Sequence, residues 1–307
     1  DQHTTASNNT AVGNDALLLN TTGTSNTAVG ALALDANTTA NNATAVGKSA
    51  LGANTTGVLN TAVGTQCLDA NTTGGSNSAL GVNALGACTT ASDNSAFGTS
   101  ALSNSTTGAS NTAVGSNALR DNTTASNNTA VGKHALLVNT TGDQNTAVGS
   151  LALDANTTGG LNCAMGVGAL SGNTTASNNT GIGHTALEAT TTGANNTALG
   201  ASSLKANTTG TQNVAVGSAA LVANTTANDN TAVGYNALAS NTTASHNVAI
   251  GSFTLDANTT GDQNTALGRA ALSENTTASN NTAVGYHSLV ANTTGSDNTA
   301  CGKKALT

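Results

Sequence analysis

A glycine returns every 17 residues along this chain, at Gly13, Gly30, Gly47 and onward to Gly302, 18 times without an insertion or a deletion. Between glycines the sequence follows G-x-x-A-L-x-x-N-T-T-(G/A)-x-x-N-T-A-V, which we number as columns 1 to 17. Surface loops usually tolerate insertions, so a period kept to the residue indicates that each residue stacks on its equivalent one coil away. The pattern predicts an all-β parallel β-solenoid (β-roll) of 17-residue coils, forming one continuous domain of 18 repeats over residues 1–307.

Composition restricts the classes of protein to which the chain can belong. Only 37% of its residues are hydrophobic and 1% are aromatic, which is too little bulk for the core of an ordinary globule of 307 residues. The net charge is −7, and the seven Lys and Arg are dispersed apart from Lys303-Lys304, which argues against a nucleic-acid partner. No apolar run approaches the roughly 18 residues that cross a bilayer, so we expect no membrane insertion.

Two columns supply nearly all the large apolar side chains. Column 5 is Leu in every repeat, and column 17 is always apolar. We expect both to face the inside of the coil, with column 15 (Thr, or Val at Val214 and Val248) inward beside column 17. The N-T-A-V segment suits a short strand. The predicted core therefore includes Leu17, Leu34, Leu51, Leu153 and Leu255 of column 5, and Val29, Val46 and Ile250 of column 17.

Threonine and asparagine also keep fixed places in the repeat. Columns 9 and 10 are Thr-Thr in every complete repeat, which predicts a second short strand. Asn fills column 14 in 17 of 18 repeats and column 8 in most. Stacked identical amides can hydrogen-bond from coil to coil, so we expect asparagine ladders, as at Asn26, Asn60, Asn77 and Asn94. Because N-T-T is also a glycosylation sequon, a glycan coat is the alternative interpretation of these columns.

One Leu and one Val per coil make a thin core, so we expect lateral partners. Column 16 is Ala in all repeats but one, which holds Gly181. The alanine column is either a contact with another chain, with Ala28, Ala45, Ala62 and Ala79 as candidates, or tight packing inside the coil. The sequence begins and ends within ordinary repeats, so we expect either stacking on other copies or a segment of a longer shaft.

The segments N-V-A-V-G at residues 213–217 and N-V-A-I-G at 247–251 resemble the signature repeat of the head domains of trimeric autotransporter adhesins. The N-T-T-G-x-x-N-T-A-V-G repeats are also similar to shaft regions of phage tail fibres and of large bacterial surface proteins. The resemblance implies a left-handed β-roll, three chains side by side, and an extracellular place on a cell-surface fibre or a virion tail fibre. It implies other copies as partners, in a homotrimer or an end-to-end polymer, and surface glycans or host receptors as ligands.

The reactive side chains do not form a recognisable site. The five histidines (His3, His134, His184, His246 and His287) occupy mostly unlike columns, whereas a metal site or a catalytic base needs converging partners. The four cysteines (Cys67, Cys88, Cys163 and Cys301) are expected to be free thiols. Acidic residues recur in column 6, but the G-G-x-G-x-D pattern of calcium-binding β-rolls is absent. We therefore predict no catalytic, metal or cofactor-binding residues, and no enzyme.

Two functions fit this sequence. The first is a structural shaft or head of an extracellular adhesive fibre, which self-assembles by lateral or end-to-end association. The alternative is an ice-binding β-solenoid that uses the stacked threonines. Because neighbouring residues on a strand point to opposite faces, only one threonine column of each Thr-Thr pair can join a flat outer array.

Overall fold

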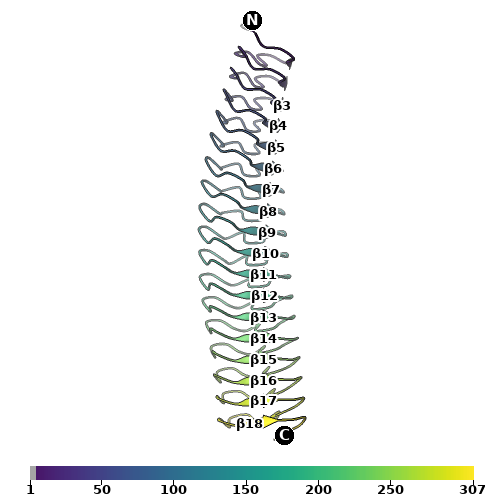
Figure 1. Cartoon of the computed structure of the whole chain (residues 1–307), viewed down its shortest axis with the longest axis vertical. Coiled ribbons are helices and arrows are strands. Elements are labelled where there is room, and N and C mark those ends of the chain that lie inside the picture. The colour runs from purple at the N-terminus through teal and green to yellow at the C-terminus, as the bar shows by residue number, and fades with distance from the viewer. Residues whose placement is uncertain (1–4) are drawn as a thin grey trace. The chain divides into compact units, whose positions relative to one another are not determined.

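The computed structural model describes residues 5–307, and these contain strands and turns but no helix (Figure 1). The chain divides into two compact units, Asp1–Thr158 and Gly159–Thr307. Each unit is a stack of 17-residue coils with one three-residue strand per coil. The predicted all-β, parallel β-solenoid is confirmed. Its continuity through both units as a single domain stays a prediction.

The strands cover columns 15 to 17 of every repeat. The first unit contains β1 (Thr10–Val12), β2 (Thr27–Val29), β3 (Thr44–Val46), β4 (Thr61–Val63), β5 (Ser78–Leu80), β6 (Ser95–Phe97), β7 (Thr112–Val114), β8 (Thr129–Val131) and β9 (Thr146–Val148). The second contains β10 (Cys163–Met165), β11 (Thr180–Ile182), β12 (Thr197–Leu199), β13 (Val214–Val216), β14 (Thr231–Val233), β15 (Val248–Ile250), β16 (Thr265–Leu267), β17 (Thr282–Val284) and β18 (Thr299–Cys301). Within each unit, neighbouring strands pair in parallel with each residue opposite its equivalent 17 positions away.

Columns 9 and 10 do not form the second strand that the sequence predicts. They bend instead, and the N–H groups of both Thr21 and Thr22 donate to the same carbonyl oxygen of Thr38, at 3.0 and 3.1 Å. An extended strand cannot aim two consecutive N–H groups at one acceptor, because they alternate in direction. The β propensity of threonine is therefore overridden here by the need to turn the chain around a narrow coil.

The recurring glycine is required both by its backbone angle and by the distance between coils. Every column-1 glycine has a φ between 127° and 139°, a region that residues with a Cβ rarely adopt. A Cβ on Gly13 would lie 2.5 Å from the carbonyl oxygen of Gly30 in the next coil. A side chain here would separate the coils, so the strict period follows from the stacking.

The column-5 leucines have an unusual backbone. Leu34 has a φ of 50°, and the equivalent leucines also lie in the left-handed region, which a bulky residue seldom occupies. The N–H of Leu34 donates to the carbonyl of Ala50 at 3.1 Å, and the side chain is fully buried. The left-handed turn thus brings the one large side chain of each coil into the interior, and burial offsets its conformational cost.

The core is made of column 5 and of small or polar residues. Leu17, Leu34, Leu51, Leu153 and Leu255 are at most 1% exposed. The placement of column 17 in the core is wrong: Val46 and Ile250 are 37% and 39% exposed, and Val29 is only partly buried. Because side chains alternate along a strand, columns 15 and 17 share the outer face, and column 16 points inward.

The alanine column lies inside the coil. Ala28, Ala45, Ala62 and Ala79 are at most 1% exposed, so they are not available to another chain. Of the two interpretations of this column, the structure shows tight packing inside the coil. The candidate chain contact at these alanines is therefore corrected.

Candidate interaction surface

The outer face of the strands carries a row of partly exposed apolar side chains in each unit. We call columns 15 and 17 of β1–β9 and of β10–β18 the strand face. In column 17, Val12 is 58% exposed, Leu80 50% and Phe97 41% in the first unit, and Met165 is 42% and Leu267 46% exposed in the second. Column 15 contributes mostly half-buried threonines. No charged residue occurs in either column of the described strands.

The structure contains the asparagine ladder of column 14. The backbone N–H of Asn77 donates to Oδ1 of Asn60 at 2.9 Å, and that of Asn94 donates to Oδ1 of Asn77 at 3.0 Å. The amide of Asn60 also donates to the carbonyl of Gly74 at 2.7 Å. The one substitution in the column, Ala43, still donates its backbone N–H to Oδ1 of Asn26 at 2.9 Å. Each asparagine therefore ties its own coil to the next.

A second ladder runs along column 8, where Nδ2 of Asn37 donates to Oδ1 of Asn20 at 2.8 Å. Among the described residues, column 8 departs from asparagine at Cys88, Ser105 and Thr190, which are fully buried as well. The column-8 asparagines from Asn20 to Asn275 and the column-14 asparagines from Asn26 to Asn281 are at most 2% exposed. A glycan cannot be attached to a buried amide in the folded coil, so these amides are structural.

The two threonine columns have different environments. The column-9 hydroxyl donates to the column-9 carbonyl of the next coil, as from Thr38 to Thr55 at 3.2 Å. The column-10 threonines are exposed in every described coil, and none of their hydroxyls bonds to another protein group. One outward row of threonines therefore remains free to bind water or a ligand.

Ionisable groups are dispersed over the described coils. Most polar contacts involve Ser, Thr, Asn and backbone groups. Three ion pairs are present among residues 5–307: Arg120–Asp121 at 2.6 Å, Lys205–Glu188 at 3.2 Å, and His246–Asp229 at 3.8 Å. His134, His184 and His287 lie on separate coils. No group of three His, Cys, Asp or Glu side chains in this part of the chain could hold a metal ion. His3, and Asp1 of column 6, lie outside the described residues.

Burial changes the acidity of several side chains. Desolvation raises the pKa of the column-6 carboxyl groups Asp35, Asp69, Asp154 and Asp256. It also raises the pKa of Cys67 to about 12 and that of Cys88 to about 11. Asp154 also interacts with the charge of His134, which acts to lower the pKa of this carboxyl group but is outweighed by desolvation. A thiol with a raised pKa is a poor nucleophile.

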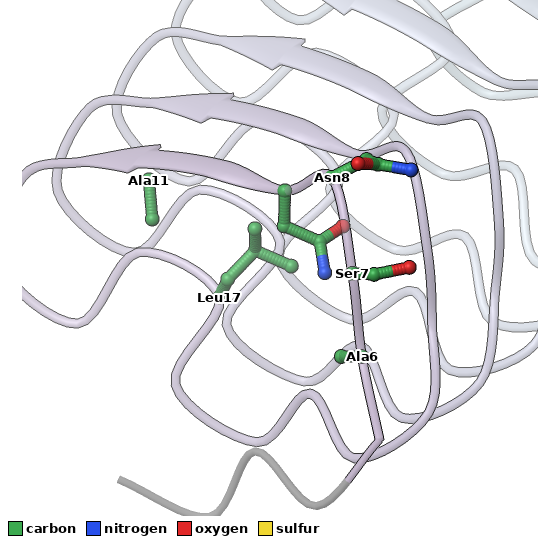
Figure 2. Close-up of a pocket in the computed structure, with 6 residues that line it drawn as sticks. Ala6, Ser7, Asn8, Ala11 and Leu17 are labelled. Atoms are coloured by element: carbon green, nitrogen blue, oxygen red, sulfur yellow. The ribbon is translucent and has the colours of Figure 1, made fainter.

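A hollow opens at the first described coil, as Figure 2 shows, and is lined by Ala6, Ser7, Asn8, Asn9, Ala11 and Leu17. Asn9, Ala11 and Leu17 belong to columns 14, 16 and 5, which are buried in the following coils. The hollow is therefore the interior of the coil seen from its end. Its lining has the same kinds of side chain as the core.

The strand face is the exposed apolar surface that the sequence analysis missed. Column 17 ranges in size from Cys301 to Phe97, whereas column 16 is Ala in all strands but one. A closed interior tolerates little change of volume, and an outer face tolerates more, so this difference was the available signal.

No helix among residues 5–307 has the length and apolarity needed to cross a membrane. No protein-family model matches the chain, and no curated protein matches it. A repetitive β-solenoid of this kind is a fold typical of structural proteins.

Proposed function

We propose that this chain is the structural shaft or head of an extracellular adhesive fibre, built by lateral and end-to-end association of copies of the chain. The strand face carries the proposal, because it presents a partly exposed apolar side chain in every coil. The largest apolar patch on a soluble protein is often an interaction surface. The resemblance of the repeats to those of trimeric adhesins and tail fibres agrees with a homotrimer on a cell surface or a virion.

The coil supplies the mechanical properties that a fibre requires. Backbone hydrogen bonds and two buried asparagine ladders join each coil to the next, so opening one coil breaks several bonds at once. The surface is mostly Ser, Thr and Asn, which keeps the chain hydrated with few charges. The variable, partly exposed columns 3 and 7 would contact surface glycans or host receptors. We assign the chain no enzymatic role and no cofactor.

Sedimentation equilibrium of the purified chain, whose monomer mass is 29.4 kDa, tests the proposal directly. We expect a trimer, or a larger polymer whose mass grows with concentration. A monomer at every concentration that can be reached would overturn a function based on self-association.

Ice binding is the second candidate, favoured by the column-10 threonines. Their hydroxyls are exposed and unpaired in every described coil, and parallel strands place equivalent residues about 4.8 Å apart. The strand does not include these threonines, so their spacing is set by the bend. Thermal hysteresis of the isolated chain tests this candidate. Activity that is lost when Thr107, Thr124 and Thr141 are replaced by Leu would establish it, and no activity in the unmodified chain would exclude it.

A further inference from the structure

We propose that the lateral partner of each solenoid unit is the same unit of a second copy of this chain, packed face to face through the strand face, parallel and in register. This inference rests on the proposed self-association and adds the surface, the direction and the alignment of the contact. It concerns columns 15 and 17 and the residues that flank them.

The period of the strand face selects the partner. An apolar side chain recurs at each coil, so the row has the spacing of a parallel sheet, about 4.8 Å. A partner that fills this row over nine coils must present contacts with the same spacing. A second copy of the chain has that spacing because it has the same repeats, and an unrelated globular surface does not.

The exposed area is large enough for a stable contact. Taking on the order of 150 Å² for a fully exposed large apolar residue, two-fifths exposure leaves about 60 Å² per coil, or roughly 500 Å² per unit from column 17. With the half-buried threonines of column 15 added, the exposed area of one unit comes close to about 800 Å², the area that each partner buries in a stable protein interface.

In part of the strand face, a small residue in column 15 stands beside a large one in column 17. Three strands have a residue smaller than threonine in column 15, and each of these has a residue larger than valine in column 17: Ser78 with Leu80, Ser95 with Phe97, and Cys163 with Met165. Three other strands combine Thr with Ile or Leu, at Ile182, Leu199 and Leu267. Exposure to water does not require a small residue to stand beside a large one, whereas close packing against a partner surface at a fixed distance from each coil does.

Charges at the two edges of the strand face determine the direction. The edge after the strands is column 2. Apart from tyrosine, its ionisable side chains are all basic: Lys48, Lys133, His184, Arg269 and Lys303. The edge before the strands, columns 12 and 13, carries the exposed carboxylates Asp93, Asp143, Asp229, Asp262 and Asp297, and one histidine, His246. In a parallel symmetric pair or ring, the end edge of one copy lies beside the start edge of its neighbour, so opposite charges meet. In an antiparallel pair, like edges meet and repel.

The same charges indicate the alignment. Asp262 and Arg269 flank β16, and Asp297 and Lys303 flank β18, so each pair lies at one level of the stack. None of these four makes an ion pair within its own chain among the described residues. A contact without axial shift lets each cation reach the carboxylate of the neighbouring copy at its own level. A shift of one coil would separate both pairs.

Cross-linking within the self-associated chain tests direction and alignment together. Equal amounts of ¹⁴N- and ¹⁵N-labelled chain are mixed by refolding and treated with a carbodiimide, and the linked peptides are identified by mass. We expect mixed-isotope links between Asp297 and Lys303. A bismaleimide that spans the about 10 Å between facing sheets uses the natural thiols of the strand face and should link Cys163 to Cys163 and Cys301 to Cys301. An antiparallel pair can bring at most one of these cysteines beside its own copy, so linking of only one, or of neither, would overturn the parallel arrangement.

Matched variants test the surface. Val114→Lys with Val233→Lys places one charge on the strand face of each unit, and Thr124→Lys with Thr243→Lys places the same charges on the exposed column 10. All four positions are outside the core, and circular dichroism checks that the coil is retained. We expect the strand-face variant to dissociate at least tenfold more readily and the control to keep its mass. If both variants stay associated, this inference fails while the proposed function stands; a monomeric unmodified chain removes both.

Discussion

Replacing Leu119 and Val114 by alanine in separate variants tests which side chains form the core. Leu119 is fully buried, whereas Val114, in the same coil region, is 37% exposed. Leu→Ala removes three carbons, about 2.4 kcal/mol at about 0.8 kcal/mol per buried carbon, and the remaining cavity raises the cost toward about 3 to 4 kcal/mol. Val→Ala removes two carbons that are only partly buried, so it should cost about 1 kcal/mol or less in the separated chain.

Native-state hydrogen exchange is the appropriate assay, because a solenoid can open locally and a single global unfolding energy can miss the effect. At tenfold per 1.4 kcal/mol, amides near Leu119 should exchange more than 100-fold faster in Leu119→Ala and less than about tenfold faster in Val114→Ala. Both variants are measured below the concentration at which the chain associates. Equal acceleration in the two variants there would refute the assignment of column 5 as core and column 17 as outer face.

Three further predictions concern other columns. Gly132→Ala places a Cβ 2.5 Å from the carbonyl of Gly149 at a φ of 137°, so thermal denaturation should show a loss of more than about 3 kcal/mol. Burial raises the pKa of Asp154, so the folded chain binds this proton more tightly than the unfolded chain; the stabilisation is complete below the unfolded pKa and is lost as the pH rises through the folded pKa. Asp154→Asn should therefore raise the melting temperature at pH 7 and have little effect near pH ~3, and a larger gain at low pH would contradict this. With a maleimide at pH 8, and below the concentration at which the chain associates, exposed Cys301 should react in the folded chain, whereas Cys67, with its pKa raised to about 12, should react only after denaturation.

The solenoid could be predicted from the sequence, because the stacking of equivalent residues requires glycine at a constant spacing. If the repeat were shifted by one residue, a residue with a Cβ would take the place of Gly30, and that Cβ would lie against the carbonyl of Gly47. The asparagine ladder was predictable for the same reason, since Asn60 and Asn77 bond through equivalent atoms in neighbouring coils. Features that repeat identically between coils can thus be inferred from the period alone.

What the period could not provide was the course of the chain within one coil. Threonine favours strands, but at Thr21 and Thr22 the chain bends, since a coil of 17 residues needs tight corners. Leucine disfavours a positive φ, yet Leu34 adopts one because that turn brings its side chain inward. Local propensities were overridden by the closure of the coil, and no sequence signal marked these positions.

The orientation of the strand shows why hydrophobicity alone chose the wrong face. Alternation along T-A-V permits either the alanine inside or the threonine and valine inside. Column 5 already places a leucine in the interior of each coil, and two buried asparagines occupy the corners, so the space left opposite the strand fits a methyl group. The larger residues must then lie outside, where an isolated chain leaves them partly hydrated. The narrow coil that buries Ala28 is therefore also the cause of the exposed apolar row beside it, and it makes association through that row a consequence of the repeat.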